Sequence, residues 1–325
     1  MKAALHQTFG APEDVMEAAE APMPAPAAGE VRIKMILSSI HNHDLWTVRG
    51  QYGYKPELPA IGGTEAVGLV DEIGEGVDPT LKGQRVSVAG VHGSWAEFFI
   101  APASGLVPLP NQISDEAASQ LIAMPFSAIS LLDFIDVKAG DWVVQTAANG
   151  AVGKIFAQLA QAKGIHVLNL VRRNEAAEEL IANGLPHVLS TDDVDWIAKA
   201  KRMVGDAGAR AAIDSVGGDL AEDLTALLGW EGLLVTFGTA TGAPLKLSSG
   251  TLITKHITIK GFWGAKVTEM MDPEKRRSLI VELVSLAVQG KLTLDTEAVF
   301  PLSEIQNALK AALVPGRKGK VLLRP

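Results

Sequence analysis

Hydrophobic and polar positions follow one pattern over roughly the first third of the chain. Short apolar runs are separated by clusters of Gly, Pro and Asp, as strands are separated by turns. The clearest runs cover residues 31–37, 66–73 and 85–88, and the Pro-rich stretch 21–28 predicts an extended connection. This region is therefore predicted to be rich in β-strands.

The pattern changes near Asn111, where amphipathic helices begin to alternate with apolar strands. Ser114 precedes an Ala-rich run over residues 115–134, which predicts a helix with Ser114 as its N-cap. Strand-like runs follow at residues 141–146, 166–171, 187–190, 211–216 and 233–237. Helical patterns separate them at residues 152–163, 175–183, 195–205 and 220–228. This alternation is typical of βαβ units in a doubly wound parallel sheet.

The C-terminal part of the chain mixes both patterns. It predicts a long helix over 273–289, a shorter helix over 302–312 and a final strand over 320–323. We therefore expect an α/β protein whose tail returns to complete the β-rich region. The predicted domains are residues 1–118 with 266–325, and residues 119–265.

Composition excludes several functions. Lys and Arg total 29 against 37 Asp and Glu, which leaves a net charge of −8 over 325 residues. A general binder of nucleic acid or of anionic membranes would need a basic face, so neither partner is expected. The chain has no cysteine, which excludes disulfides, iron–sulfur clusters, thiolate zinc sites and a cysteine nucleophile.

Targeting and membrane-spanning segments are not expected either. The N-terminal residues lack a basic start followed by an apolar run, so they do not form a signal peptide. No window reaches the ~18 uninterrupted apolar residues of a membrane-spanning helix. We therefore predict a cytoplasmic protein.

One loop has the spacing of a dinucleotide-binding fingerprint. The strand over 141–146 runs directly into Ala147-Ala148-Asn149-Gly150-Ala151-Val152-Gly153, and a helix follows. Small residues permit the tight turn, Gly153 permits close packing of the helix on the strand, and the helix N-terminus offers free N–H groups. The predicted cofactor-binding residues of this loop are Ala147, Asn149, Gly150, Ala151, Val152 and Gly153.

The residues after the second strand indicate which cofactor binds. An NAD site places Asp or Glu about 20 residues beyond the loop, to bind the ribose hydroxyls. This chain has Arg172 and Arg173 there, and guanidinium groups hold a 2′-phosphate bidentately. The sequence therefore favours NADPH over NADH, although a solvated basic pair at a helix start would give the same residues.

With this loop placed, the whole chain resembles the medium-chain dehydrogenases/reductases. The matching segments are Asn42-His43-Asp44, residues 59–68, the loop, residues 214–218 and Gly319-Lys320-Val321. The resemblance implies a GroES-like β-rich catalytic domain and a Rossmann domain. It also implies that Gly238, Thr239 and Lys320 contact the cofactor.

The zinc alcohol dehydrogenases of that superfamily bind their metal through cysteines and the His of a Gly-His-Glu triplet. Here the triplet is Gly63-Thr64-Glu65, and no cysteine exists. We therefore expect no metal. We interpret Glu65 as a buried structural carboxylate and His41 as a core or pocket histidine. The natural chemistry is then direct hydride transfer to an activated double bond or to a quinone.

Two zinc-free groups of the superfamily remain, quinone oxidoreductases and mitochondrial-type 2-enoyl thioester reductases. The segment 50–54 resembles the Gly-x-Tyr-Gly segment of the enoyl reductases, in which Tyr52 falls on the catalytic tyrosine. Gly261-Phe262-Trp263 and Arg172 also resemble that group. These short matches favour the enoyl reductases, and quinone reduction stays open as the alternative.

The resemblance implies conjugate reduction by NADPH, with hydride delivered to the β-carbon of an enone or 2-enoyl thioester. Tyr52 is expected to aid protonation or to stabilise the enolate, and Asn42 to hold the Tyr52 loop or the nicotinamide ribose. The predicted pocket residues are Tyr54, His43 and Trp263. A non-catalytic NADPH-binding protein is the alternative of another class.

Three further segments are interpreted mainly by their place in the fold. Asp214 at the end of a buried strand fits a structural role as well as a functional one. Lys275-Arg276-Arg277 is interpreted as a solvated helix face rather than a coenzyme A site. The apolar stretch 253–263 is strand-like, and we expect it to form the sheet edge through which two copies pair as a homodimer.

Overall fold

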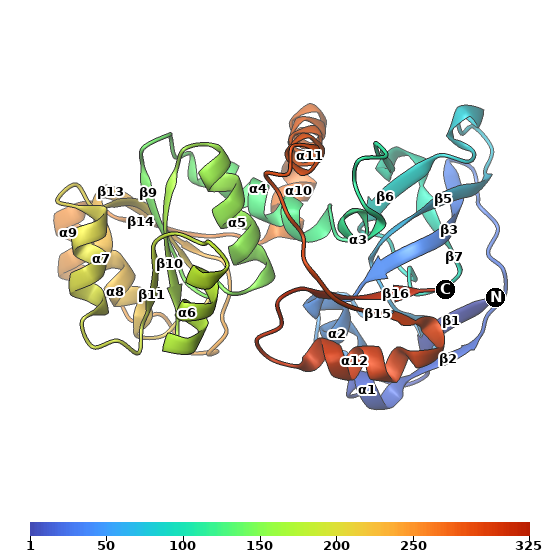
Figure 1. Cartoon of the computed structure of the whole chain (residues 1–325), viewed down its shortest axis with the longest axis horizontal. Coiled ribbons are helices and arrows are strands. Elements are labelled where there is room, and N and C mark those ends of the chain that lie inside the picture. The colour runs from blue at the N-terminus through green and yellow to red at the C-terminus, as the bar shows by residue number, and fades with distance from the viewer. The chain divides into compact units, whose positions relative to one another are not determined.

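The computed structural model describes all 325 residues, which divide into two compact units. Unit 1 consists of Met1–Ala123 and Leu283–Pro325, and unit 2 consists of Met124–Glu282. Both ends of the chain therefore contribute to unit 1. The architecture is the expected α/β fold, with a β-rich unit and a unit built on a parallel sheet (Figure 1).

Unit 1 is built from two sheets. Its strands are β1 (Lys2–His6), β2 (Met16–Glu20), β3 (Glu30–Ser39), β4 (Ala60–Ile61), β5 (Glu65–Ile73), β6 (Arg85–Ala89), β7 (Phe98–Pro102), β8 (Val107–Pro108), β15 (Thr296–Pro301) and β16 (Lys320–Arg324). A three-stranded sheet has the order β2-β1-β4, and a seven-stranded sheet has the order β15-β16-β3-β5-β6-β8 with β7 paired to β3. The C-terminal strand β16 thus lies beside β3 from the first part of the chain.

Short helices close unit 1 around one hydrophobic core. They are α1 (Pro12–Val15), η1 (Pro79–Leu81), α2 (Asn42–Val48), η2 (Ala103–Gly105), α3 (Asp115–Ala118), η3 (Leu302–Glu304) and α12 (Ile305–Leu313). The core joins β-strand residues such as Ile33 to Leu309 of α12, and it includes the fully buried Trp95. The Trp95 indole N–H donates to the Ser39 carbonyl at 3.2 Å, which satisfies the one polar group that this ring buries.

Unit 2 contains a six-stranded sheet in which every pair is parallel. The strands are β9 (Trp142–Gln145), β10 (His166–Val171), β11 (Val188–Ser190), β12 (Ala209–Asp214), β13 (Leu228–Thr236) and β14 (Thr258–Gly261). Their order, β11-β10-β9-β12-β13-β14, reverses direction between β9 and β12. In such sheets ligands bind outside the carboxyl ends of the strands, at the point of reversal.

Helices cover both faces of this sheet, α5 and α6 on one face and α7, α8 and α9 on the other (Figure 1). The helices are α4 (Ala123–Ile135), α5 (Ala151–Ala162), α6 (Asn174–Ala182), α7 (Trp196–Val204), α8 (Leu220–Leu227), α9 (Ser249–Lys255), α10 (Gly264–Met270) and α11 (Pro273–Val288). Because α4 begins at Ala123 and α11 continues to Val288, both helices cross the limits of unit 2.

The predicted single helix over residues 115–134 is wrong. Ser114 does cap α3, where its hydroxyl accepts the Ala117 N–H, but α3 ends at Ala118. A second helix starts at Ala123, because the Glu65 carboxylate accepts the N–H groups of Ile122 and Ala123. A contact from a distant part of the sequence therefore divides a locally helical run.

The predicted strand over residues 253–263 is also only partly correct. Ile253 belongs to α9, which Ser248 caps by accepting the Thr251 N–H. His256 then turns the chain with a φ of 52°, and only Thr258–Gly261 forms the edge strand β14. No helix in the structure is both long enough and apolar enough to cross a membrane.

Candidate active site

The loop between β9 and α5 has the backbone geometry that a phosphate-binding turn requires. Ala147 has a φ of 52°, and Gly150 is extended as the N-cap of α5. A Cβ at Gly153 would lie 2.9 Å from the Ala148 Cα and 3.0 Å from the Ala147 carbonyl oxygen. A side chain at position 153 would overlap the backbone of the turn, so this position requires glycine.

Two buried polar side chains hold this loop, and the sequence prediction did not identify them. The Gln145 amide donates to the Gly153 carbonyl at 2.9 Å and to the Asn169 side-chain oxygen at 2.7 Å. Asn169 in turn donates to the carbonyls of Val167 and Pro186. The signal for both residues was an amide inside an otherwise apolar strand run, which needs partners when it is buried.

The other predicted cofactor residues of unit 2 follow strands of the same parallel sheet. Arg172 comes directly after β10 and is exposed, and Arg173 is the N-cap of α6. Gly238 and Thr239 follow β13, where the Gly238 N–H donates to the Asp214 carbonyl at 3.2 Å. Because carboxyl ends of parallel strands meet at one edge, these residues share that edge with the loop.

The structure also shows the surroundings of three other residues of unit 2 that the sequence analysis singled out. The Asp214 carboxylate accepts the N–H groups of Val216 and Gly217, so it shapes the turn after β12. Lys275 forms an ion pair with Asp133 at 2.5 Å. Trp263 is the N-cap of α10 and is 67% exposed, so it is not part of the core.

In unit 1 the two tyrosines lie in the loop after α2, and both side chains are exposed. The Tyr52 ring is tilted over the His43 ring, with 5.9 Å between the centroids. The Tyr54 ring is stacked on His92 at 4.0 Å. Asn42, at the first position of α2, is exposed and its side chain makes no hydrogen bond within the chain. The structure thus brings His43 to Tyr52 but leaves Asn42 free.

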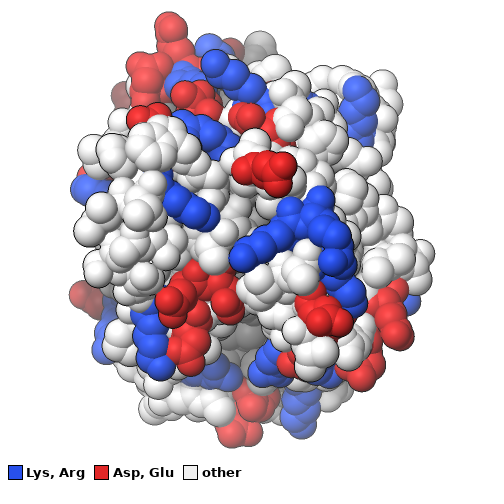
Figure 2. Space-filling view, turned by 90° about the vertical axis from the view of Figure 1, so that its left-hand side faces the viewer, with Lys and Arg blue, Asp and Glu red and all other residues white.

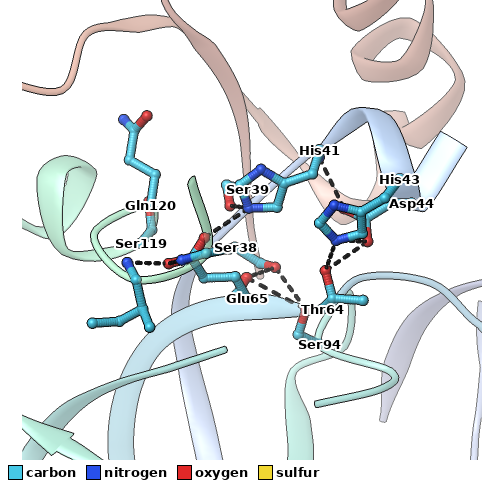
Figure 3. A network of polar contacts seen from close by, with 12 residues as sticks. Ser38, Ser39, His41, His43, Asp44, Thr64, Glu65, Ser94, Ser119 and Gln120 are labelled. Carbon is cyan, nitrogen blue, oxygen red and sulfur yellow. Dashed lines mark hydrogen bonds and ion pairs between the residues drawn. The ribbon is translucent and has the colours of Figure 1, made fainter. Parts of the chain in front are cut away.

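A polar network joins His43, Thr64 and Asp44 (Figure 3). The His43 Nε2 atom is 2.7 Å from the Thr64 hydroxyl, which donates to Asp44 Oδ1 at 2.7 Å. Asp44 Oδ2 accepts the backbone N–H of His41 at 2.8 Å, so both carboxylate oxygens are used. Thr64 occupies the position of the missing histidine of the zinc-binding triplet, and its place in a hydrogen-bonded chain was not predicted from the sequence.

Next to this network, His41 and Glu65 form a fully buried pair. Glu65 Oε2 lies 2.7 Å from His41 Nε2, and Ser39 Oγ lies 2.8 Å from the same nitrogen. The predicted burial of Glu65 and of His41 is confirmed, since neither residue is exposed. The His41 Nδ1 atom is buried without a hydrogen-bond partner.

Burial sets the charges of this cluster. Burial raises the pKa of the Glu65 carboxyl to about 7, although the N–H groups of Ala123 and Ile122 act in the opposite direction. Burial also lowers the pKa of His41 well below its ordinary value, and the positive charge of Lys320 acts in the same direction. Burial lowers the pKa of Lys320 to about 8, against the pull of Asp44. Lys320, assigned above to the cofactor, therefore stands beside this carboxylate cluster in unit 1.

The residues present do not fit a catalytic zinc site. The chain offers no thiolate, and no three His, Asp or Glu side chains are arranged to hold a metal ion. The nucleotide loop does fit a dinucleotide, because Gly153 keeps the turn clear of side chains and α5 presents its N-terminus to it.

A unit with a doubly wound parallel sheet and a glycine-containing phosphate turn, joined to a GroES-like β-rich unit, defines a two-domain nicotinamide-dependent oxidoreductase. Residues 27–111 match the family described as "Alcohol dehydrogenase GroES-like domain", and residues 151–279 match "Zinc-binding dehydrogenase". The chain belongs to the medium-chain dehydrogenase/reductase family.

Similar curated proteins are mitochondrial enoyl-[acyl-carrier-protein] reductases. The human protein is 30% identical over 99% of this chain and 88% of its own length. The Caenorhabditis elegans protein is 32% identical over 89% of this chain and 84% of its own length.

Similar solved structures include quinone reductases. A putative NADPH:quinone reductase from Bacillus thuringiensis matches all of this chain and 98% of its own, with a TM-score of 0.90 and 26% identity. The Escherichia coli quinone oxidoreductase in complex with NADPH matches 100% of both chains, with a TM-score of 0.86 and 27% identity.

Proposed function

We propose that this protein is an NADPH-dependent, zinc-independent reductase of activated double bonds, acting on enones or 2-enoyl thioesters. The observation that carries the proposal is the exposed Tyr52 phenol beside His43, in a unit whose residues do not form a zinc site. The similarity to enoyl reductases over nearly the whole chain supports the same reaction class.

We assign the cofactor to the carboxyl edge of the parallel sheet in unit 2. The turn Ala147–Gly153 and the N-terminus of α5 would hold the pyrophosphate, and Arg172 with Arg173 would hold the 2′-phosphate. Gly238 and Thr239 would lie along the path to the nicotinamide. Bound NADPH supplies the hydride, and its presence in the E. coli quinone oxidoreductase supports this assignment.

The residues of unit 1 would stabilise the negative charge that forms on the substrate and would supply the proton for the α-carbon. The Tyr52 hydroxyl is suited to donate a hydrogen bond to the carbonyl oxygen of the substrate, where negative charge grows as hydride reaches the β-carbon. A phenol is also able to supply the proton that completes the α-carbon. Tyr54, His43 and Trp263 are proposed as pocket residues, and Asn42 is free to contact the ribose or the substrate.

On the face drawn in Figure 2, basic and acidic side chains are interspersed, and the largest group of adjacent basic side chains is flanked by acidic ones. The ion pair of Lys275 with Asp133 also neutralises one charge of the basic helix start. No broad basic surface for the phosphates of coenzyme A is seen on this face.

Quinone reduction is the second candidate. The solved structures that match all of this chain include quinone reductases from several bacteria. A quinone accepts hydride without metal activation, so the same residues would serve it.

The turnover test compares two substrates and two tyrosines. NADPH oxidation followed at 340 nm is expected with crotonyl-CoA, and Tyr52→Phe is expected to lower kcat about 100-fold, because general acids typically contribute 10²–10⁴-fold. Tyr54→Phe is the matched comparison and is expected to lose less, since its ring is stacked on His92. Turnover with 1,4-naphthoquinone alone would assign the quinone alternative. No turnover of either substrate, with NADPH bound, would leave a non-catalytic NADPH-binding protein.

The cofactor assignment predicts that NADPH binds more tightly than NADH. Arg172→Ala is expected to weaken NADPH binding about 30-fold and to leave NADH binding nearly unchanged, because hydrogen bonds to charged groups contribute ~1.5–3 kcal/mol. Calorimetric titration measures both dissociation constants. Arg202→Ala, which removes an exposed arginine in the last turn of α7, is the matched control. An equal loss for both cofactors would contradict the role of Arg172 in selectivity.

We further propose a homodimer that pairs through β14, and a cytoplasmic location. β14 is the edge strand of the sheet and all four of its residues are exposed. Trp230 of the adjacent strand β13 is 62% exposed. An unpaired edge with apolar side chains is a ready surface for a second copy. Sedimentation equilibrium decides between this dimer and a 34.2 kDa monomer.

A further inference from the structure

The hydrogen-bonded chain beside Tyr52 determines where His43 carries its proton. The Thr64 hydroxyl has one hydrogen, and it donates that hydrogen to Asp44 Oδ1. The contact of 2.7 Å between His43 Nε2 and the same hydroxyl must therefore be a hydrogen bond that His43 donates. Neutral His43 is thus held as the Nε2–H tautomer, because Thr64 has no second hydrogen to offer (Figure 3).

The far end of this chain is fixed by buried groups. Asp44 has an exposed fraction of only 2%, and its Oδ2 atom accepts the His41 N–H. This carboxylate therefore has no freedom to turn away from Thr64. The His41 ring is stacked on the His43 ring, with 5.1 Å between centroids and 13° between planes, which fixes the plane of His43.

The other nitrogen of His43 remains available. The His43 Nδ1 atom makes no hydrogen bond within the chain, and the side chain is 24% exposed. The ring that lies over it is that of Tyr52. The arrangement is a carboxylate, a hydroxyl and an imidazole in series, with the free imidazole nitrogen on the side away from the carboxylate.

We propose that His43 is the group that supplies the reaction's proton by way of Tyr52, oriented by Thr64 and Asp44. This inference rests on the proposed reductase function and adds a residue role to it. In this role His43 takes part in proton transfer and does not only line the pocket. Asp44 acts through Thr64, and both are positioning residues.

The proton and the electrons balance in a simple sequence. The substrate gains a hydride at the β-carbon from the nicotinamide, and the two electrons of that hydride reduce the double bond. The Tyr52 O–H bond breaks as the α-carbon–hydrogen bond forms. A proton from the solvent adds to the free Nδ1 atom of neutral His43, and the resulting imidazolium passes that proton to the Tyr52 oxygen, which returns His43 to its Nε2–H form. During this step Asp44, one hydroxyl away, stabilises the positive imidazole.

The first test needs no substrate. Nitrogen-15 spectra of the intact, histidine-labelled protein report which ring nitrogen of each histidine carries the proton, and the signal lost in His43→Gln identifies residue 43. We expect the Nε2–H tautomer in the wild type and in Thr64→Ser, which keeps the hydroxyl. In Thr64→Val, which keeps the shape but has no hydroxyl, we expect a mixture of tautomers. An Nδ1–H tautomer in the wild type, or no change in Thr64→Val, would overturn the inference.

The second test distinguishes proton supply from packing. His43→Ala is expected to lower kcat for crotonyl-CoA about 100-fold with an unchanged NADPH dissociation constant, and added imidazole is expected to restore at least tenfold of that loss. Imidazole should not rescue Tyr52→Phe. The matched control is His166→Gln, which changes an exposed histidine at the start of β10. A change in KM alone, or no rescue by imidazole, would show that His43 only lines the pocket and would overturn the proposal.

The two tests also separate this inference from the function on which it rests. Wild-type protein without turnover of crotonyl-CoA or naphthoquinone would remove the reductase function and the proton step together, even with the expected tautomer. Turnover that survives in His43→Ala would remove only the role of His43.

Discussion

Glu65→Ala is expected to lower the free energy of unfolding by about 4 kcal/mol. The substitution leaves the N–H groups of Ile122 and Ala123 without their acceptor, at ~1–3 kcal/mol for each buried group. It also removes one of the two partners of His41 Nε2, leaving Ser39, and opens a cavity in a fully buried site. Urea unfolding of the variant and the wild type measures the difference.

Glu65→Gln is the matched control, because the amide oxygen still accepts both N–H groups and the amide nitrogen is able to donate to His41.

The raised pKa of Glu65 means that its contribution to stability is fully present below pH 4.5 and is lost as the pH rises through about 7. The stability of the wild type relative to Glu65→Gln is therefore expected to fall by about 3 kcal/mol between pH 4.5 and pH 8. Parallel pH profiles for the two proteins, or a Glu65→Ala variant as stable as the wild type, would contradict this account.

Gly153→Ala is expected to weaken NADPH binding about 100-fold, equivalent to ~2.7 kcal/mol. The added Cβ would lie 2.9 Å from the Ala148 Cα and carbonyl oxygen and 3.0 Å from the Ala147 carbonyl oxygen. All three contacts are with backbone, so the phosphate turn itself must move. Overpacking of this kind also costs ~1–3 kcal/mol of stability. Fluorescence titration with NADPH and a thermal melt measure the two effects.

Gly250→Ala is the matched control for this substitution. Gly250 lies in helix α9 of the same unit, and the nearest atom to a Cβ there is the Ser248 hydroxyl at 3.6 Å. This variant should bind NADPH like the wild type, since alanine favours a helix and meets no backbone. NADPH affinity within threefold of the wild type in Gly153→Ala would show that the turn does not hold the pyrophosphate.

Unit 2 shows how far local pattern determines a fold. The strand predicted over 166–171 is β10, and the helix predicted over 220–228 differs from α8 by one residue at its end. Buried parallel strands are continuous apolar runs and their helices are amphipathic, so each element is marked by its own residues. The phosphate turn was predictable for the same reason, because its geometry depends on small residues at fixed spacing.

The failures have a common cause. The run over 115–134 has helical residues throughout, and only the contact with Glu65, more than 50 positions earlier, divides it. The stretch 253–263 has β-branched residues, but the Ser248 cap starts a helix that includes Ile253. In both segments a specific hydrogen bond outweighed a propensity that is worth only tenths of a kcal/mol per residue.

The sequence by itself determined the two kinds of unit, the turn at Ala147–Gly153, the arginine that follows β10 and the loss of every thiolate ligand. These depend on residue type and spacing along a short length of chain. The tertiary structure alone decided that Thr64 joins His43 to Asp44, and that Glu65 and Lys320 share one buried cluster. The physical reason is that tautomers and pKa values depend on burial and on neighbours in space, and β5, α2 and β16 bring those neighbours together from distant parts of the chain.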